Sequence, residues 1–359
     1  MTTRVFVIAE AGVNHNGSLA KAKKLVKVAV DAQADAVKFQ TFKTQNLVSV
    51  KAPKAAYQKE KTDAGESQFK MLKKLELDEK SHRELINCCD ELGIQFLSTP
   101  FDLESVDLLV GRLNLPRIKI SSGEITNAPL LLKVAQSGKP VIISTGMSTL
   151  KEIETALGIL AFGYSRKKEK YSISNFQKAY SSKAGQSALQ EKVVLLHCTT
   201  EYPAPFEDAN LRAMDTMRSA FGLPVGFSDH TPGIACAIAA VARGAVVIEK
   251  HFTLDKNMPG PDHQASLDPQ ELKDMIKAIR QVELALGSLS KTPTISEGRN
   301  MEVIRKSLVA ACDIRKGENF SDENLTVKRP ANGISPLKYW EYLGKVAKRN
   351  YKKDDLIEP

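Results

Sequence analysis

The sequence predicts an α/β protein: a (β/α)8 (TIM) barrel followed by a small C-terminal domain. Short apolar runs rich in β-branched residues alternate with amphipathic helical runs, which is typical of βα units around a parallel sheet. Eight such apolar runs occur before residue 250, and eight parallel strands close a barrel. The length of 359 residues exceeds that of one typical domain and favours a large domain plus a small one.

The strands are predicted in chain order from these apolar runs. They cover residues 5–9, 36–39, 95–97, 117–120, 140–143, 193–196, 224–227 and 246–249. Helices are predicted between and after them, over residues 19–31, 79–92, 150–160, 235–241 and 269–286. An open doubly wound sheet is the alternative architecture. The barrel is favoured because no Gly-x-Gly-x-x-Gly follows the first strand.

Two connections are too long to be simple turns. Residues 41–67 follow the second strand and include Lys43, Lys51, Lys54, Tyr57 and Gln58. On a barrel this position predicts a lid over the catalytic mouth. Residues 163–190 are polar, rich in Ser and Lys and without helical periodicity, so they predict a flexible insertion at the opposite face.

The pattern of βα units ends near residue 286. The predicted domains are therefore a catalytic barrel over residues 1–286, a Gly/Ser/Thr/Pro-rich linker over 287–300 and a compact unit over 301–359. Within this unit we expect strands at 307–311 and 325–328 and a turn at 315–318. Because about 55 residues are near the lower limit for independent folding, this unit is expected to lean on a partner surface.

Composition and charge exclude several classes of protein. Hydrophobic residues make up 42% of the chain and charged residues 26%, and no run of about 18 apolar residues suggests a membrane span. A strand predicted from residue 5 leaves no room for a signal peptide, so we expect a cytoplasmic enzyme. The five cysteines show no metal-binding spacing and are expected to be reduced thiols.

The net charge of +9 could indicate a nucleic-acid partner, but its distribution argues against one. Residues 166–183 contain six Lys or Arg and one Glu, so most of the excess falls in one predicted loop. Nucleic-acid binding would need basic residues with interleaved aromatic residues along a regular element. We therefore expect no nucleic-acid partner.

Two histidines stand at the ends of the last two predicted strands, in GFSDH (226–230) and IEKHFT (248–253). If these strands are neighbours, His230 and His251 come to the same face of the barrel. Two neutral imidazoles there, with a carboxylate or water, could bind Mn, Fe or Zn. The alternative is that each histidine only makes a local hydrogen bond.

Catalytic groups of a barrel enzyme lie at the carboxyl ends of its strands, so the residues there form one candidate site. They are Glu10, Asn14, His15, Lys38, Gln40, Ser98, Thr99, Lys119, Ser122, Glu124, Ser144, Thr145, His197, Thr199, Thr200, Ser228, His230, Glu249 and His251. Lys38 and Lys119 lie within strands, where a lysine is costly unless an anion pairs with it, so they indicate a pocket for a small phosphorylated or carboxylated substrate. The alternative is that both lysines pair with Glu10 and Glu124 in the barrel core.

Two further residues stand outside this set. Asp262 lies in the Gly/Pro-rich loop MPGPDH (258–263) after the last strand, where it would either accept hydroxyl hydrogen bonds at the mouth or be solvated. Arg329 lies in the small C-terminal domain and on composition alone is a surface arginine.

Nine motifs in this order resemble bacterial N-acetylneuraminate (sialic acid) synthases over nearly the whole chain. They are IAEAGVNHNG (8–17), VKFQTF (37–42), STPF (98–101), SGE (122–124), STGM (144–147), HCTTEYP (197–203), GFSDH (226–230), EKHFT (249–253) and KRPANG (328–333). The resemblance implies a (β/α)8 barrel, a C-terminal antifreeze-like (SAF) domain and a domain-swapped homodimer. It also implies condensation of phosphoenolpyruvate with N-acetylmannosamine to give N-acetylneuraminate and phosphate, with a divalent metal, most often Mn, with Mg or Co as alternatives.

The resemblance also implies a role for each matching residue. His230 and His251 would bind the metal, and Arg329 would reach the sugar's N-acyl group from the other subunit. Glu10, Gln40, Tyr202 and Asp262 would contact the sugar, and Glu124 would lie close to the reacting carbons. Glu10 and Glu124 would be catalytic, with Glu10 orienting the attacking water. Phosphoenolpyruvate would be held by Lys38, Thr99, Lys119, Ser122, Ser144, Thr200 and Ser228. Thr200 departs from the family pattern, because some members have Asn there.

Several alternatives remain open at this stage. A legionaminic or pseudaminic acid synthase would use the same chemistry on a diacetamido-trideoxy hexose. A metal-dependent aldolase would need a Schiff-base lysine and no phosphoenolpyruvate. A carbohydrate-binding protein would show surface aromatic residues, yet Trp340 is the only Trp.

Overall fold

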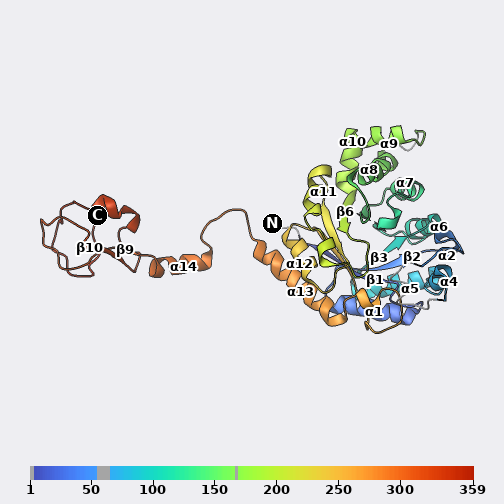
Figure 1. The fold of residues 1–359 in the computed structure, drawn as a ribbon, viewed down its shortest axis with the longest axis horizontal. Coiled ribbons are helices and arrows are strands. Elements are labelled where there is room, and N and C mark those ends of the chain that lie inside the picture. The colour runs from blue at the N-terminus through green and yellow to red at the C-terminus, as the bar shows by residue number, and fades with distance from the viewer. Residues whose placement is uncertain (1–3, 55–64, 166–168) are drawn as a thin grey trace. The chain divides into compact units, whose positions relative to one another are not determined.

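The computed structural model describes residues 4–54, 65–165 and 169–359. The chain forms two compact units, Met1–Gly287 and Ser288–Pro359, which we call the barrel unit and the C-terminal unit (Figure 1). Each is described by itself.

The barrel unit confirms the predicted (β/α)8 architecture. Its eight strands are β1 Phe6–Gly12, β2 Ala36–Thr41, β3 Gln95–Pro100, β4 Ile118–Ile120, β5 Val141–Ser144, β6 Val193–Cys198, β7 Val225–Asp229 and β8 Val247–His251. Each strand pairs in parallel with its neighbour in the order β3-β2-β1-β8-β7-β6-β5-β4. Because β3 and β4 also contact each other, the sheet closes on itself.

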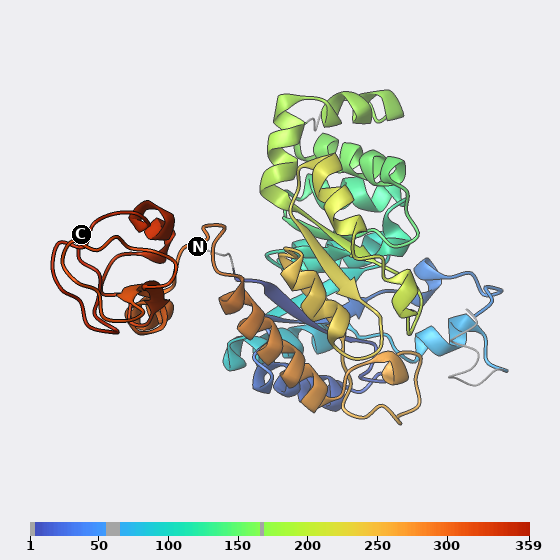
Figure 2. The same ribbon diagram turned by 60° about the vertical axis from the view of Figure 1, so that its left-hand side comes forward.

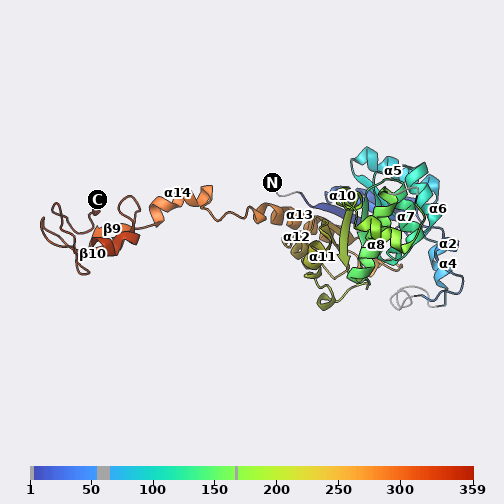
Figure 3. The same cartoon turned by 90° about the horizontal axis from the view of Figure 1, so that it is seen from above.

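Helices lie around the outside of these strands (Figures 1 and 3). One principal helix follows each strand in turn: α1 Leu19–Asp31, α5 Glu79–Leu92, α6 Leu103–Asp107, α7 Ala128–Gln136, α8 Leu150–Ser165, α11 Ala213–Phe221, α12 Ala235–Ala242 and α13 Pro269–Leu286. Short turns of helix add η1 Leu108–Arg112, η2 Ser122–Glu124, η3 Phe206–Asp208 and η4 His263–Ala265. Figure 2 shows α12 and α13 side by side, as their contacts require.

The ends of α13 illustrate how local sequence fixes these helices. Asp268 accepts a hydrogen bond from the backbone of Glu271, whose side chain bonds back to the backbone of Asp268, and Pro269 occupies the first turn. This capping box satisfies amide groups that would otherwise lack partners. The predicted bounds of α1, α5 and α13 match the observed ones because each begins at such a capping residue.

The interior of the barrel is layered with a period of two residues. A first layer of apolar side chains is made by Ile8, Ala36, Leu97, Ile142, Leu196 and Val247. Two residues further along most of these strands stand Glu10, Lys38, Thr99, Ser144 and Glu249. Because side chains of a strand alternate between its faces, this second layer points to the same interior one step nearer the carboxyl ends. An apolar floor thus supports a polar layer.

One glycine of β7 allows this packing. A Cβ atom built at Gly226 would lie 2.3 Å from the carbonyl oxygen of Val247 and 2.7 Å from Leu196. No larger side chain fits there without a shift of backbone, so the position below Ser228 must be glycine.

The insertion over residues 163–190 is helical in its described part, so the prediction of a flexible loop was wrong. Two helices, α9 Ile173–Tyr180 and α10 Lys183–Lys192, begin at Ser172 and Ser182, whose hydroxyl groups cap them. Their apolar residues pack on α8, with the ring centroids of Phe162 and Phe176 separated by 5.1 Å. The apolar positions are few and were hidden by the surrounding Ser and Lys, while α8 supplies the packing surface that makes these helices stable.

The predicted lid after β2 is described in part. Two short helices, α2 Thr44–Leu47 and α4 Gln68–Lys73, flank the segment, and Tyr57 and Gln58 lie outside the described residues. Val13, Phe42 and Leu75 form a small apolar cluster beneath α2 and α4. The two helices therefore stand on the barrel rim above β1 and β2.

The C-terminal unit has its own small core. Strands β9 Ser307–Ala310 and β10 Leu325–Lys328 pair antiparallel, as predicted, and the remaining elements are α14 Ile295–Ile304, η5 Pro336–Lys338 and α15 Tyr339–Tyr342. The core contains Leu308, Ala310, Ile314, Phe320, Leu325, Ile334, Ala347, Tyr351 and Ile357. The predicted linker over 287–300 is helical from Ile295, because Thr294 and Glu297 form a capping box that starts α14 inside it.

The structure also shows the state of the cysteines and the length of the apolar helices. All five cysteines are free, and Cys89 and Cys198 are buried. Among the described residues, the structure contains no helix with the length and apolar character required to span a bilayer.

A buried ion pair ties β7 to β8 on the outer side of the sheet. The Nζ of Lys250 lies 2.9 Å from Oδ2 of Asp229, and both side chains are fully buried. Lys250 also donates to the carbonyl of Thr231, while the other carboxylate oxygen of Asp229 accepts from the amide and hydroxyl groups of Thr231. The pair therefore holds the turn that carries His230.

We predict that Asp229→Ala lowers the free energy of unfolding by about 3–5 kcal/mol, because it leaves the Lys250 ammonium buried without a counter-ion. The matched control is Asp215→Ala, which breaks half-exposed pairs with Arg218 and Arg243 and should cost less than about 1 kcal/mol. Urea denaturation followed by circular dichroism measures both. Equal losses in the two variants would contradict the assignment.

Candidate active site

A polar cavity of about 410 Å³ opens at the carboxyl ends of the strands. It is lined by every residue to which the resemblance gave a role except one: Glu10, Lys38, Gln40, Thr99, Lys119, Ser122, Glu124, Ser144, Thr200, Tyr202, Ser228, His230, His251 and Asp262. The exception, Arg329, is an exposed residue of the C-terminal unit. Of the other residues predicted at the strand ends, Glu249 lines the cavity, whereas Asn14, His15, Ser98, Thr145, His197 and Thr199 do not. Residues from all eight strands or the loops after them thus converge on one space.

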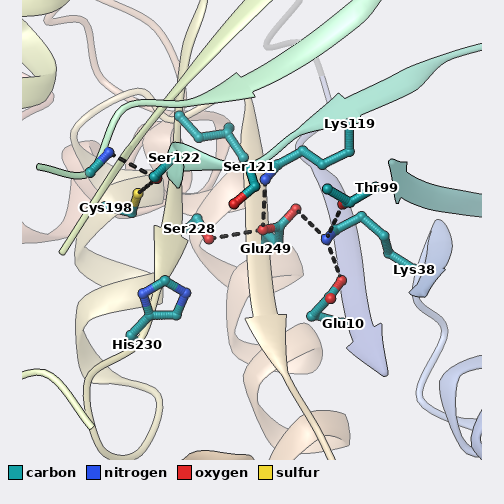
Figure 4. Close-up of polar contacts among 12 residues, drawn as sticks. Glu10, Lys38, Thr99, Lys119, Ser121, Ser122, Cys198, Ser228, His230 and Glu249 are labelled. Carbon is teal, nitrogen blue, oxygen red and sulfur yellow. Dashed lines mark hydrogen bonds and ion pairs between the residues drawn. The ribbon is translucent and has the colours of Figure 1, made fainter. Parts of the chain in front are cut away.

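A network of four charged side chains, which we call the charged floor, lies at the bottom of this cavity (Figure 4). The Nζ of Lys38 lies 2.5 Å from Glu10 and 3.6 Å from Glu249, and it donates to the Thr99 hydroxyl at 3.1 Å. The Nζ of Lys119 lies 3.3 Å from Glu249. All four charged side chains are almost completely buried. Such a cluster is stable only because each charge faces an opposite one.

Burial and neighbouring charges set the protonation of this network. Burial, with a further contribution from Glu249, raises the pKa of Glu10 to about 7, although Lys38 opposes the shift. For Glu249 burial is outweighed by Lys119 and Lys38, which lower its pKa to about 2. Burial disfavours the charged form of Lys38, but Glu10 and Glu249 raise its pKa above the usual value. The cluster therefore carries a positive surplus whenever Glu10 is protonated.

Glu249 is the member of this network to which the sequence analysis gave no role. It accepts a hydrogen bond from the Ser228 hydroxyl at 2.9 Å and pairs with both lysines. The expected partner Glu124 instead accepts a hydrogen bond from Asn127 at 2.6 Å. The available signal was spacing, since Glu249 precedes His251 by two residues and must share its face of the strand.

The two histidines lie together beside the network, with ring centroids 5.7 Å apart. Burial lowers the pKa of His230 to about 4, and burial together with His230 and Lys38 lowers the pKa of His251 well below its usual value, so both rings are neutral. The Nδ1 of His230 hydrogen-bonds the Thr199 carbonyl at 2.6 Å, which leaves Nε2 for a ligand. The Nδ1 of His251 is buried and lacks a hydrogen-bond partner among the described residues.

This donor set fits a divalent cation. Neutral imidazoles oriented by a backbone carbonyl are typical ligands of Mn, Fe and Zn. Within the described residues no group of three or more His, Cys, Asp or Glu side chains is placed to hold a metal. A cation on His230 and His251 would therefore keep positions open for water or substrate oxygen atoms.

Hydroxyl groups gather on the other side of the cavity. The Ser122 hydroxyl accepts from the Gly146 amide at 2.9 Å and lies 3.1 Å from the Cys198 sulfur (Figure 4). The hydroxyl oxygens of Ser144 and Thr200 are buried, and neither has a partner within the described part of the chain. Buried hydroxyl groups without partners indicate a site that a polar ligand completes.

Tyr202 and Glu124 close the rim. The Tyr202 ring lies 4.2 Å from the ring of His230 and 5.7 Å from that of His251, measured between centroids. Burial raises the pKa of Glu124, although the hydrogen bond from Asn127 opposes it. Asp262 lines the mouth from the loop after β8, as predicted.

Residues 25–291 of the chain match the NeuB family, and residues 305–359 match the SAF domain. The chain is 55% identical over 99% of both chains to N,N'-diacetyllegionaminic acid synthase of Campylobacter jejuni. It is 45% identical to the enzyme of the same name from Legionella pneumophila, over 94% of this chain and 89% of the other.

The fold agrees with these matches. A crystal structure of the N-acetylneuraminic acid synthetase from Leptospira borgpetersenii, in complex with citrate, superposes with a TM-score of 0.66 and 33% identity, covering 83% of this chain and 90% of the other. Both the barrel unit and the C-terminal unit thus have counterparts among known proteins. The chain belongs to the NeuB family of sialic and related acid synthases and carries a C-terminal SAF domain.

Proposed function

We propose that the protein is a nonulosonic acid synthase of the legionaminic type, which condenses phosphoenolpyruvate with a diacetamido-trideoxy hexose and releases phosphate. Its identity of 55% and 45% to two N,N'-diacetyllegionaminic acid synthases exceeds its 33% identity to the sialic acid synthetase of known structure. The sequence analysis favoured N-acetylmannosamine as the acceptor, and that sugar becomes the alternative. Pseudaminic acid synthesis is the other variant of the same chemistry.

One observation supports this proposal above the others: a pair of buried lysines faces a pair of neutral histidines in a single cavity. Lys38 and Lys119 suit the phosphate and carboxylate groups of phosphoenolpyruvate, and the hydroxyl groups of Ser144 and Thr200 still need partners. A bound anion would compensate part of the positive charge of Lys38 and Lys119 that Glu249 otherwise compensates. A small dianionic substrate therefore fits this side of the site.

The histidines suit the acceptor's aldehyde. A divalent cation such as Mn, held by His230 and His251, supplies Lewis-acid polarisation of a carbonyl oxygen. Tyr202 stacks beside His230 and narrows the space in which the aldehyde can lie. The open-chain sugar would then have its first carbon near β7 and β8, facing the phosphoenolpyruvate bound over the lysines.

The protein groups also account for the remaining chemistry. Carbon 3 of the enolpyruvate forms the new bond to the aldehyde carbon, and the electron pair of the aldehyde double bond moves to its oxygen, which takes up a proton and becomes a hydroxyl group. Cationic character is left at carbon 2. A water molecule adds at carbon 2, and the bond from that carbon to the phosphate oxygen breaks. Glu10, with a pKa of about 7, can take a proton from this water near neutral pH, while Lys38 and Lys119 offset the charge of the departing phosphate.

Arg329 and the C-terminal unit support a dimer. We propose a homodimer in which the C-terminal unit of one chain covers the barrel mouth of its partner and brings Arg329 to the sugar. In agreement with a surface that awaits a partner, Leu337 and Trp340 of this unit are 87% and 76% exposed.

We also propose a cytoplasmic location, which the free thiols of all five cysteines support.

The direct test of the function is phosphate release from phosphoenolpyruvate in the presence of Mn. We expect release with the diacetamido-trideoxy hexose and kcat/KM at least about tenfold lower with N-acetylmannosamine. A preference for N-acetylmannosamine would reinstate the alternative acceptor. No release with either sugar would contradict the proposal, and sugar elongation from pyruvate would favour an aldolase.

Replacing a metal ligand should separate metal binding from folding. We expect His230→Ala to lose at least about 100-fold in kcat and to weaken Mn binding measured by electron paramagnetic resonance. The control is His197→Asn, since His197 bonds the Ala209 carbonyl outside the cavity and should leave Mn affinity unchanged. Full activity of His230→Ala after chelation and metal return would exclude the metal's role.

A mixing experiment tests the dimer. His230→Ala and Arg329→Ala should each be inactive alone, whereas co-expressed chains should recover activity at about a quarter of the sites, because half of the dimers are mixed and each mixed dimer has one intact site. Recovery requires that His230 and Arg329 of one site come from different chains. No recovery in a confirmed mixed dimer would show that both come from the same chain.

A further inference from the structure

The wall of the cavity is divided by chemistry. Hydroxyl groups of Ser122, Ser144, Thr200 and Ser228 come from β4 to β7 and the loops after them. The opposite side, over β1 to β3, carries an apolar group besides the polar residues Glu10, Lys38, Gln40 and Thr99. The members of this apolar group, which we call the apolar wall, are Val13, Leu47, Met71, Leu72 and Phe101.

The side chains of the apolar wall are held in place by packing against other apolar residues. Val13 follows β1, Leu47 ends α2, Phe101 follows β3, and Met71 and Leu72 belong to α4. Leu47, Leu72 and Phe101 pack against the cluster of Val13, Phe42 and Leu75. Met71 and Val13 are only 4% exposed. The wall therefore has support from behind and presents its surface to the cavity.

The positions of the lysines, hydroxyl groups and histidines determine which part of the acceptor lies against this wall. The two lysines and the hydroxyl groups of β4 to β7 would hold the anionic substrate, and the histidines of β7 and β8 would mark the aldehyde carbon of the acceptor. Since β1 to β3 are the next strands around the barrel, the carbons furthest from the aldehyde extend over them. Gln40 and Gln68 also line this side and can bond amide groups.

The two acceptors differ at this end. A diacetamido-trideoxy hexose carries acetamido groups at two of its deoxy positions, and its third deoxy position is the terminal carbon, which is a methyl group. N-acetylmannosamine shares one acetamido group but has hydroxyl groups at the other two positions, including the terminal carbon. A hydroxyl group placed against apolar side chains loses its water without gaining a partner, whereas a methyl group gains contact.

We propose that the apolar wall is the specificity-determining subsite for the deoxygenated, methyl-terminated end of the acceptor, with Met71 and Leu72 as its central residues. This inference rests on the proposed function, because it assigns a place to that function's acceptor. It adds that selection acts against a terminal hydroxyl group and is independent of phosphoenolpyruvate binding.

The unaltered enzyme provides the first test. N-acetylmannosamine and its 6-deoxy analogue differ only by the terminal oxygen, so the wall should make kcat/KM about tenfold higher for the 6-deoxy sugar. The KM for phosphoenolpyruvate should be the same with both. Equal kcat/KM for the two sugars would overturn the inference while leaving the proposed synthase activity intact, and inactivity with every sugar would instead remove the proposed function.

The second test alters the wall. Met71→Gln and Leu72→Asn keep similar side-chain size but add an amide, so each should lower the ratio of kcat/KM between the 6-deoxy and 6-hydroxy sugars several-fold, with an unchanged KM for phosphoenolpyruvate. The control is Leu75→Gln, which places an amide in the same cluster but does not line the cavity. It should reduce stability without changing the ratio. A ratio that shifts equally in all three variants, or in none, would contradict the assignment.

Discussion

Two lysines buried inside the barrel are the constraint on which the rest of the site depends. An ammonium group that leaves water must face a carboxylate or an anion. Lys38 and Lys119 share Glu249, and Glu10 completes the set. This requirement explains why the four charged groups gather at one place in the barrel, three of them in the layer directly above the apolar one. The charges balance when Glu10 is ionised, and one positive charge is left over when Glu10 is protonated.

The two carboxylates of this network differ in their protonation. Glu249 lies between both lysines and stays ionised, whereas Glu10 pairs with one lysine and has a pKa near neutrality. Two carboxylates at similar depth therefore differ in what they can do: one is a fixed counter-charge and the other can exchange a proton. The neutral histidines beside them keep their nitrogen lone pairs available for a cation.

The cavity joins three surfaces of different chemistry around a single ring of strands. In the proposed reaction, the charged and hydroxyl groups would face phosphoenolpyruvate, the imidazoles would face the aldehyde, and the apolar wall would face the methyl-terminated end of the acceptor. The charged residues come from β1, β2, β4 and β8, the hydroxyl groups from β4 to β7 or the loops after them, and the apolar wall from the segments that follow β1 to β3.

The sequence by itself determined the eight strands, five of the eight principal barrel helices and the identity of nearly every polar residue in the cavity. It could do so because strand alternation and the position of residues at strand ends are local properties. Only the tertiary structure decided which charges pair, since Glu249 and Lys119 are 130 residues apart and Glu124, the nearer candidate, bonds Asn127 instead. It also decided that α9 and α10 form, because their few apolar residues become a helix face only when α8 packs against them, and that Leu47, Met71 and Phe101 become one wall, because closing the barrel brings distant segments to one rim.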